Sequence, residues 1–438
     1  MCASEKTGVC PVCGKEHKST VKEVVSGKGA IKKLTDFVKD YKKVFVLADK
    51  NTFNVAGEKV ISILNENNIA YSKYIFQDGA LEPDERAVGS AVMHFDTACD
   101  IIVAIGSGVV NDIGKIVSNV SKRPYIIVAT APSMDGYASA TSSTIIDGFK
   151  ISVNSKAPDF IIGDTDILKT APDQMLKSGL GDMIAKYVSI CEWRIAKLLL
   201  GEYYCEEVAK LVRSALKKCV DNADGLLKRD DDAIEAVFSG LVKSGVAMNY
   251  AGLSRPASGM EHYISHVWDM RALSKGTPAD MHGIQCGIGT FTAAKLYDKL
   301  KNVTPDKDKA LAYVKSFDNE KWNKELRDFV GVGAESMILQ EKTEQKYNLE
   351  SHKNRLDKII ENWDEILKIV SEELPTSDEI EKILDTIKAP KLCSDIGLEK
   401  SIMPMTFKTT KDVRDKYILS RLLWDLGLLD EFADTLSE

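Results

Sequence analysis

The sequence lacks long hydrophobic runs. Among its 438 residues, no uncharged apolar stretch approaches the ~18–20 residues that a membrane-spanning helix needs. The longest candidate, Ile101–Val110, is interrupted by Gly106, Ser107 and Gly108. The opening segment Met1–Lys18 has no apolar core and therefore does not resemble a secretory signal. We expect no membrane span and a cytoplasmic location.

An excess of positive charge and a paired cysteine framework are also missing. Lys and Arg number 58 against 65 Asp and Glu, which gives a formal net charge of −7. An acidic chain is a poor general binder of nucleic acid, because phosphate contacts need a basic surface. The nine cysteines are odd in number and scattered, which does not suit a disulfide scaffold. With 44% hydrophobic residues, the chain is long enough for two or three globular domains.

The first third of the chain alternates strand-like and helix-like segments. The strand-like runs are short and apolar, as expected for strands buried on both faces. They lie at residues 44–48, 71–76, 101–105 and 125–129, and the helical spacings at 52–67, 83–95 and 112–120. This alternation predicts a parallel sheet with helices on both faces. The sequence 144–153 predicts a hairpin around Asp147-Gly148, and 160–163 one more strand.

After about residue 165 the strand signals almost vanish. Helical spacings follow at residues 180–200, 206–227, 232–248, 260–270, 287–300 and 348–373. We therefore expect an α/β domain over residues 1–165, with a short cysteine-containing N-terminal segment, and an all-helical domain over residues 166–438.

Two polar loops follow successive predicted strands. Gly106–Gly114 is rich in small residues and opens a helix, so its backbone can approach a phosphate at a helix N-terminus. The alternative is that these residues form only a tight strand-to-helix turn and bind no ligand. The second loop, Thr130–Ser139, gathers hydroxyls and the carboxylate of Asp135. Because ligands of open α/β sheets bind at the carboxyl ends of strands, the two loops together favour a ligand site.

A third group of candidate residues is spread over the helical half. Asp182 follows two glycines, and His262 and His266 are four residues apart, which places them on one helix face. His282 follows soon after. One carboxylate and two imidazoles with an open position suit Zn²⁺ or a similar catalytic ion. Ordinary core or capping histidines are the alternative.

The N-terminal segment contains Cys10-Pro-Val-Cys13, half of a zinc-knuckle pattern. A closed structural zinc site needs four ligands, which Cys2, Cys10, Cys13 and His17 could supply.

Several of these motifs, in their order and spacing, resemble the glycerol-1-phosphate dehydrogenases. This family lies within the superfamily of iron-containing alcohol dehydrogenases, glycerol dehydrogenases and dehydroquinate synthases. The resemblance covers roughly residues 40–290. Its carriers are Gly106–Asp112, Pro132–Ser139, Gly179–Asp182, Ser258–Trp268 and His282-Gly283. It implies a dehydroquinate synthase-like fold with the site in the cleft between the two domains. Residues 1–165 would then bind the nucleotide cofactor, and residues 166–438 the metal and the substrate.

The resemblance implies a role for each candidate residue. Asp182, His262 and His282 match metal ligands, while Asp135, Asp182 and His266 match substrate-contacting positions. Asp182 and His266 are the catalytic candidates. The cofactor is NAD(H) or NADP(H), with Asp49 at the adenosine ribose. The residues implied to contact the rest of the cofactor are Gly106, Ser107, Gly108, Val109, Val110, Asn111 and Asp112 at the pyrophosphate, and Thr130, Ser133 and Ser139 at the nicotinamide.

The implied reaction is the reversible reduction of dihydroxyacetone phosphate to sn-glycerol 1-phosphate, a step of phospholipid metabolism. The implied metal is Zn²⁺, with Ni²⁺ or Fe²⁺ as alternatives, and we expect a homo-oligomer acting on a small phosphorylated molecule. A glycerol dehydrogenase with an unphosphorylated substrate remains open, as does a non-catalytic sensor of nucleotide or metal. Arg255 is a candidate for the substrate phosphate. The interval between His262 and His282 is longer than the family pattern leads us to expect.

Overall fold

The computed structural model describes residues 9–77, 81–146 and 149–437. Two compact units account for them: residues 1–183 with 206–253, and residues 184–205 with 254–438. The first contains the parallel sheet and the second is helical, so the predicted fold class is confirmed. The predicted division at residue 165 follows the last strand, which ends at Asp164, whereas the compact units divide the chain elsewhere.

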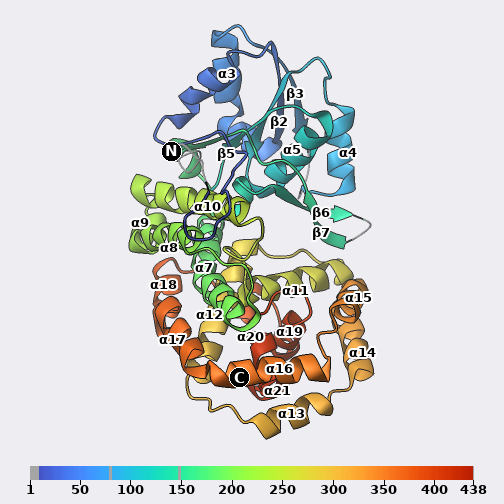
Figure 1. Ribbon diagram of the computed structural model, residues 1–438. Helices are drawn as coiled ribbons and strands as arrows, with labels where there is room; N and C mark the ends of the chain where they lie inside the picture. Colours follow the sequence, from blue (N-terminus) through green and yellow to red (C-terminus); the bar gives the residue numbers. More distant parts are fainter. Residues whose placement is uncertain (1–8, 78–80, 147–148, 438) are drawn as a thin grey trace. The chain divides into compact units, whose positions relative to one another are not determined.

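The first unit is built on a sheet of six parallel strands, counted over the described residues, in the order β1-β8-β5-β4-β2-β3. Strands β2, β3 and β5 of this sheet are labelled in Figure 1. Its strands are β1 (Glu23–Gly27), β2 (Lys43–Asp49), β3 (Ala70–Phe76), β4 (Ile101–Gly106), β5 (Tyr125–Ala129) and β8 (Phe160–Asp164). Five of them lie at the predicted positions. The partly exposed β1, with Ser26 and Gly27 in its short sequence, was not predicted.

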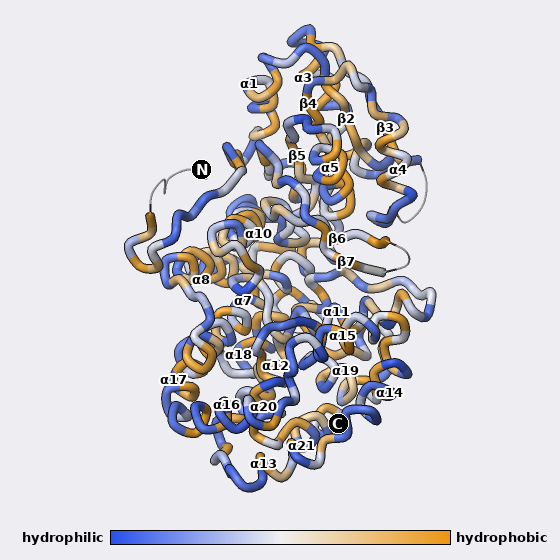
Figure 2. Tube along the Cα trace, turned by 45° about the vertical axis from the view of Figure 1, so that its right-hand side comes forward, coloured by the Kyte–Doolittle hydropathy of each residue, from blue (hydrophilic) through white to orange (hydrophobic). Residues whose placement is uncertain are grey.

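Hydrophobic burial on both faces explains the sheet. Every residue of β4 and β5 is buried, and Figure 2 shows the strands largely in the colour of hydrophobic residues. One face, including Val46 and Val103, packs in a cluster with α1 (Leu34–Val38) and α3 (Glu58–Glu66). Helix α5 (Gly108–Ser121) packs against β4 and β5.

The predicted helix over residues 52–67 is divided in the structure. It consists of α2 (Lys50–Thr52), a π-helical turn (Phe53–Gly57) and α3. The Phe53 ring lies so close to Gly57 that a Cβ there would be 2.3 Å from it. The wider turn therefore accommodates an aromatic ring that the hydrophobic spacing alone does not reveal.

The remaining elements of the first unit are helices and one hairpin. Strands β6 (Thr141–Ile146) and β7 (Phe149–Asn154) pair antiparallel as predicted, while the Asp147-Gly148 turn lies outside the described residues. The other helical elements are η1 (Ala30–Lys33), α4 (Glu85–Met93), η3 (Asp135–Tyr137), α6 (Thr165–Leu168), α8 (Glu206–Asp221), α9 (Ala223–Leu226) and α10 (Asp231–Ala251). Helix α7 (Asp173–Leu200) begins in this unit and continues into the second.

In the second unit, the described residues form helical elements around a core that contains Trp268, Phe407 and Trp424. The elements that carry the site are α11 (Met260–Lys275) and α12 (His282–Leu300). The predicted helix over 348–373 is two helices, α16 (Leu349–Glu361) and α17 (Trp363–Glu373). The others are α13 (Lys307–Lys315), α14 (Asn319–Val330), η4 (Gly331–Gly333), α15 (Ala334–Glu344), α18 (Ser377–Thr386), η5 (Cys393–Ile396), η6 (Lys400–Ile402), α19 (Met403–Thr410), α20 (Leu419–Asp425) and α21 (Leu429–Asp434).

Over the described residues, the helices are too short or too polar to cross a lipid bilayer.

Candidate active site

The first polar loop connects the carboxyl end of β4 to α5. Ser107 is the N-cap residue of α5, and its Oγ accepts a hydrogen bond from the Gly108 amide at 2.6 Å. Ser107, Gly108 and Val109 are partly exposed, so this helix N-terminus is accessible to an anionic group. A Cβ at Gly106 would lie 2.5 Å from that of Val110, which makes close packing one reason for the glycine there.

Val110 and Asn111 lie deeper than the rest of the loop, with 2% and 0% of their surface exposed. The Asn111 side chain donates from Nδ2 to the Gly136 carbonyl at 3.2 Å and accepts from the Tyr125 hydroxyl at 3.0 Å. The buried side chain of Asn111 therefore holds the first polar loop in place through these hydrogen bonds. A direct contact between either residue and a cofactor stays a prediction.

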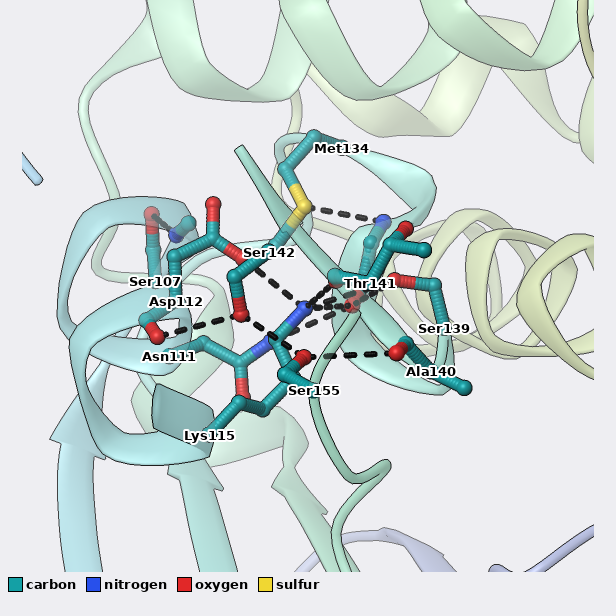
Figure 3. Close-up of polar contacts among 12 residues, drawn as sticks. Ser107, Asn111, Asp112, Lys115, Met134, Ser139, Ala140, Thr141, Ser142 and Ser155 are labelled. Carbon is teal, nitrogen blue, oxygen red and sulfur yellow. Dashed lines mark hydrogen bonds and ion pairs between the residues drawn. The ribbon is translucent and has the colours of Figure 1, made fainter. Parts of the chain in front are cut away.

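Lys115 joins the two polar loops, and the sequence interpretation did not identify it. Its side chain is fully buried, and its Nζ lies 2.8 Å from Asp112 Oδ1. The same ammonium donates to the carbonyl of Thr141 at 2.5 Å and to Ser139 Oγ at 3.3 Å (Figure 3). One buried cation thus ties α5 to the loop after β5. The Asp-x-x-Lys spacing, which places the two side chains on one helix face, was the only available signal.

The second loop lies against the first at the carboxyl end of the sheet. The Thr130 amide donates to the Gly106 carbonyl at 3.1 Å, and Ser107 Oγ is 3.2 Å from Ser133 Oγ. The hydroxyls of the two loops are therefore brought together, as the strand-end argument predicts.

The beginning of α7 packs against this second loop. Ser178 Oγ donates to the Ser133 carbonyl at 2.9 Å. A Cβ at Gly179 would be 1.8 Å from the Pro132 carbonyl oxygen, so only glycine permits this approach. One turn later, Asp182 Oδ2 accepts a hydrogen bond from the Asp135 amide. The glycine of the Gly-Leu-Gly-Asp motif therefore has a packing role that places Asp182.

Asp135 is held on both sides. Its amide binds Asp182, and its Oδ2 accepts from the Ser244 hydroxyl of α10 at 2.8 Å. Asp135 is 8% exposed and Asp182 is fully buried.

Asp49 ends β2 and is the N-cap residue of α2. Its Oδ1 accepts from the amides of Asn51 at 2.8 Å and Thr52 at 2.9 Å. The carboxylate is thus oriented at the carboxyl end of its strand, and its second oxygen has the chemistry to accept from a ribose hydroxyl.

The three predicted histidines lie together in the second unit. His262 and His266 are on α11, and His282 is the first residue of α12. The ring centroids of His262 and His282 are 4.9 Å apart, and those of His266 and His282 are 6.2 Å apart. The longer interval before His282 is taken up by the end of α11 and a loop, and His282 still reaches the cluster.

The imidazole of His262 is oriented by its neighbour Glu261. Its Nδ1 lies 2.7 Å from Glu261 Oε1, an arrangement that directs Nε2 toward a metal in metalloproteins. Burial, with a smaller contribution from Lys186, holds the pKa of His262 well below 6.5. The ring is therefore neutral near pH 7, as a metal ligand must be.

His282 is oriented in a similar way. Its Nδ1 lies 3.1 Å from Ser265 Oγ, and that hydroxyl donates to Gln285 Oε1 at 2.5 Å. Cys286 was not predicted, but its Sγ is 3.6 Å from His282 Nε2, and His262, His282 and Cys286 form a cluster of metal-ligand types. The His-x-x-x-Cys spacing on a helix was the signal for it.

Basic residues near the histidine-bearing helix are engaged in the protein itself. The Arg255 guanidinium binds Glu202, with Nε at 2.7 Å from Oε1, and donates to the Tyr417 carbonyl. Lys416 donates to the Ser258 carbonyl at 2.7 Å, and burial lowers its pKa to about 7. The hydrogen bonds of Arg255 therefore stabilise the segment that precedes α11 in the chain.

Comparison with known proteins identifies the class. The sequence profile of the iron-containing alcohol dehydrogenases matches residues 25–172. The crystal structure of glycerol dehydrogenase from Schizosaccharomyces pombe superposes with a TM-score of 0.60 at 16% identity, covering 96% of this chain and 92% of that one. This likeness shows the fold, which is that of the glycerol dehydrogenase class.

Two relatives narrow the family. The glycerol-1-phosphate dehydrogenase of Geobacillus thermodenitrificans is 34% identical over 286 residues, which are 64% of this chain and 71% of the relative. The protein of that name from Halalkalibacterium halodurans is 29% identical over 413 residues, 93% of each chain. The chain belongs to the NAD(P)-dependent glycerol-1-phosphate dehydrogenase family, and the predicted resemblance is confirmed.

Proposed function

We propose that the protein catalyses the reversible reduction of dihydroxyacetone phosphate to sn-glycerol 1-phosphate with NAD(P)H and a divalent metal. The observation that carries this is the cluster of three histidines, two of them with rings oriented by hydrogen bonds, in a chain whose sheet ends in two hydroxyl-rich loops. The names of the relatives agree with this activity.

Asp182, His262 and His282 are the proposed metal ligands. A carboxylate and two neutral imidazoles are ligand types that Zn²⁺ accepts in catalytic sites. The hydrogen bonds of Nδ1 in both imidazoles support coordination through Nε2. Ni²⁺ and Fe²⁺ suit nitrogen and oxygen donors as well, so the native metal is a matter for elemental analysis.

The bound metal would supply Lewis acidity at the C2 oxygen of the substrate, stabilising negative charge there. Asp135 is proposed to accept a hydrogen bond from a substrate hydroxyl, and its hydrogen bonds with Asp182 and Ser244 support this role by holding it in place. His266 is partly exposed beside His282 and is proposed to donate or accept the proton of a substrate oxygen.

The cofactor is proposed to lie over the carboxyl end of the sheet. The loop Gly106–Asp112 would hold the pyrophosphate at the N-terminus of α5, and Thr130, Ser133 and Ser139 would line the nicotinamide. Asp49 would accept from the adenosine ribose and disfavour a 2′-phosphate, which favours NADH.

We also propose a cytoplasmic location for the protein. None of the cysteines in the described part of the chain forms a disulfide, which supports a reducing, cytoplasmic compartment. We also propose a homo-oligomer, which light scattering of the purified protein tests.

The decisive assay uses protein stripped of metal and reloaded separately with Zn²⁺, Ni²⁺ and Fe²⁺. Oxidation of NADH in the presence of dihydroxyacetone phosphate should return with at least one of these metals. Failure with all three would overturn the proposal.

Two alternatives have their own discriminating measurements. A glycerol dehydrogenase would show a higher kcat/KM for glycerol than for glycerol 1-phosphate. A non-catalytic sensor would lose only ligand binding on His282→Ala, whereas an enzyme should lose turnover by orders of magnitude while the chain remains folded.

A further inference from the structure

The segment that contains Cys10 and Cys13 has a defined turn. The Cys10 amide donates to the Lys15 carbonyl, and the Gly14 amide to the Cys10 carbonyl, both at 2.8 Å. Gly14 has φ of 71°, and Val9 and Glu16 form an antiparallel bridge. Both sulfur atoms are thus presented from one tight turn, although the segment is too short to bury a core of its own.

Two further ligand-type residues complete a cluster. The Sγ or ring-nitrogen atoms of Cys10, Cys13, His17 and Cys205 all lie within 4.8 Å of one another. His17 Nε2 is 3.3 Å from Cys13 Sγ. Cys205 is fully buried and is joined by one peptide bond to Glu206, the first residue of α8, so covalent geometry places it at that helix end.

We propose that Cys10, Cys13, His17 and Cys205 bind a structural Zn²⁺ ion, distinct from the proposed Asp182, His262 and His282 site. Three thiolates and one imidazole are a common closed ligand set for structural zinc. With Zn–S bonds of ~2.3 Å, tetrahedral ligands are separated by roughly 3.8 Å, which is compatible with this cluster. The cysteines are not oxidised to a disulfide, as coordination requires.

The surroundings of His17 support a fixed ligand. The side chain is 4% exposed, and its ring stacks on Tyr250 of α10 at a centroid distance of 5.4 Å. The ring therefore has a defined plane, with Nε2 directed at the Cys13 sulfur. The fourth ligand is Cys205 instead of Cys2, which belongs to the N-terminal residues outside the described part.

The ion would link the N-terminal turn to the start of α8. Four protein ligands leave no position for a substrate, so the role is structural. Because metal binding supplies folding free energy to a short segment, removing the ion should loosen residues 9–17 first. The ligand set combines Cys10, Cys13 and His17 near the start of the sequence with Cys205, about 190 positions later, so no sequence spacing identifies it.

The chemistry of the two proposed sites separates them in solution. Substitution of the full-length protein with Co²⁺ should produce sulfur-to-cobalt charge-transfer absorption from the thiolate cluster. The Asp182, His262 and His282 set contains no thiolate, and Cys286→Ser removes the thiol that lies beside His262 and His282. We expect the absorption to persist in both His282→Ala and Cys286→Ser.

Single substitutions of the cluster test the ligand set. Cys13→Ser and Cys205→Ser should each lose the charge-transfer absorption and bind one zinc equivalent fewer per chain than the parent. Val12→Ser is the matched control, because Val12 lies between the two cysteines and is 55% exposed, so zinc content should not change. His17→Cys exchanges the imidazole for a fourth thiolate, so it should keep a four-ligand set and retain the metal.

Several results would overturn the proposal. One is a parent protein whose Co²⁺ form lacks sulfur charge transfer, a measurement that requires no variant and no loss of fold. Another is charge transfer that disappears in Cys286→Ser and survives in Cys13→Ser. If Cys205→Ser keeps its full zinc content, the ligand set is wrong.

Discussion

The amide of Asp135 donates a hydrogen bond to the carboxylate of Asp182 over 2.9 Å. This bond joins the residue proposed to contact substrate to a residue proposed to bind the metal. Both are in the first compact unit, and Ser244 holds the other end of Asp135. A substitution of Asp182 can therefore affect both metal binding and the position of Asp135. A substitution that keeps the hydrogen-bond acceptor and removes the charge tests metal binding separately.

Asp182→Asn should abolish most activity while preserving the fold. The amide oxygen can still accept from Asp135, but the negative charge that a divalent cation requires is lost. We expect kcat/KM to fall by at least about 100-fold and the bound metal to fall with it. Elemental analysis beside thermal unfolding checks this, and an inactive variant with full metal content would contradict the proposed ligand role.

Gly179→Ala should move α7 away from the loop after β5. The added Cβ would be 1.8 Å from the backbone oxygen of Pro132, which cannot rotate away as a side chain can. We expect a loss of ~1–3 kcal/mol in the free energy of unfolding, together with a lower kcat. Denaturant unfolding and steady-state kinetics measure both effects.

Gly89→Ala is the matched control for that substitution. Gly89 is exposed within α4, and a Cβ there meets no atom within 4 Å. Alanine should stabilise the helix by ~0.5–1 kcal/mol and leave the kinetics unchanged. Equal destabilisation by the two substitutions would show that the contact with Pro132 is unimportant.

The sequence predicted the sheet because its central strands are short apolar runs with no competing pattern. The observed bounds of β5, Tyr125–Ala129, are the predicted ones, because a hydrophobic run is followed directly by a turn there. Strand β1 was not predicted because Glu23–Gly27 shows no alternation of polar and apolar residues. Its partner in the sheet, β8, lies far along the chain. Pairing between distant segments is decided by packing, which a local pattern does not encode.

Candidate site residues were predictable where residues of an infrequent, chemically reactive type occur close together in the sequence. His262, His266 and His282 fall within a short stretch and do meet in the structure. Lys115 and Cys205 were not predictable, since a buried lysine resembles any helical surface lysine and Cys205 stands far from its partners. Their roles arise only when the fold brings separate segments together.

Lys115→Met should weaken cofactor binding and lower stability. Methionine fills similar volume but leaves the Asp112 carboxylate and the Thr141 carbonyl without the buried ammonium. Removal of one partner from a buried ion pair costs about 3 kcal/mol. The dissociation constant for NADH should rise, as fluorescence titration would detect. Lys59→Met, at an exposed position on α3, is the control and should leave both quantities unchanged.

Asp49→Ser should shift the cofactor preference toward NADPH. Serine is also a favourable N-cap residue, so α2 keeps its cap while the negative charge that would repel a 2′-phosphate is removed. We expect the ratio of kcat/KM for NADPH over NADH to rise roughly tenfold, about 1.4 kcal/mol of differential binding. An unchanged ratio with an intact fold would place the adenosine ribose elsewhere.

Asp159→Asn should destabilise the protein in a pH-dependent way. Burial raises the pKa of Asp159, but hydrogen bonds from Lys156 and the Tyr125 amide outweigh it, and the pKa lies below 3.8. A carboxyl whose pKa is lower in the folded state contributes stability that is present above its unfolded pKa, about 3.9. That contribution is lost as the pH falls through the folded pKa.

The parent should therefore exceed Asp159→Asn in stability by about 2–3 kcal/mol at neutral pH, since charged hydrogen bonds are lost. The difference should shrink as the pH falls below about 4, because the carboxyl of the unfolded chain is protonated first and that of the folded parent only at lower pH. Urea unfolding of both proteins over a range of pH measures this. Asp36→Asn, which alters an exposed pair with Lys33, should change stability little at any pH. A difference between parent and Asp159→Asn that is constant down to low pH would mean that shape, and not charge, makes Asp159 important to the sheet.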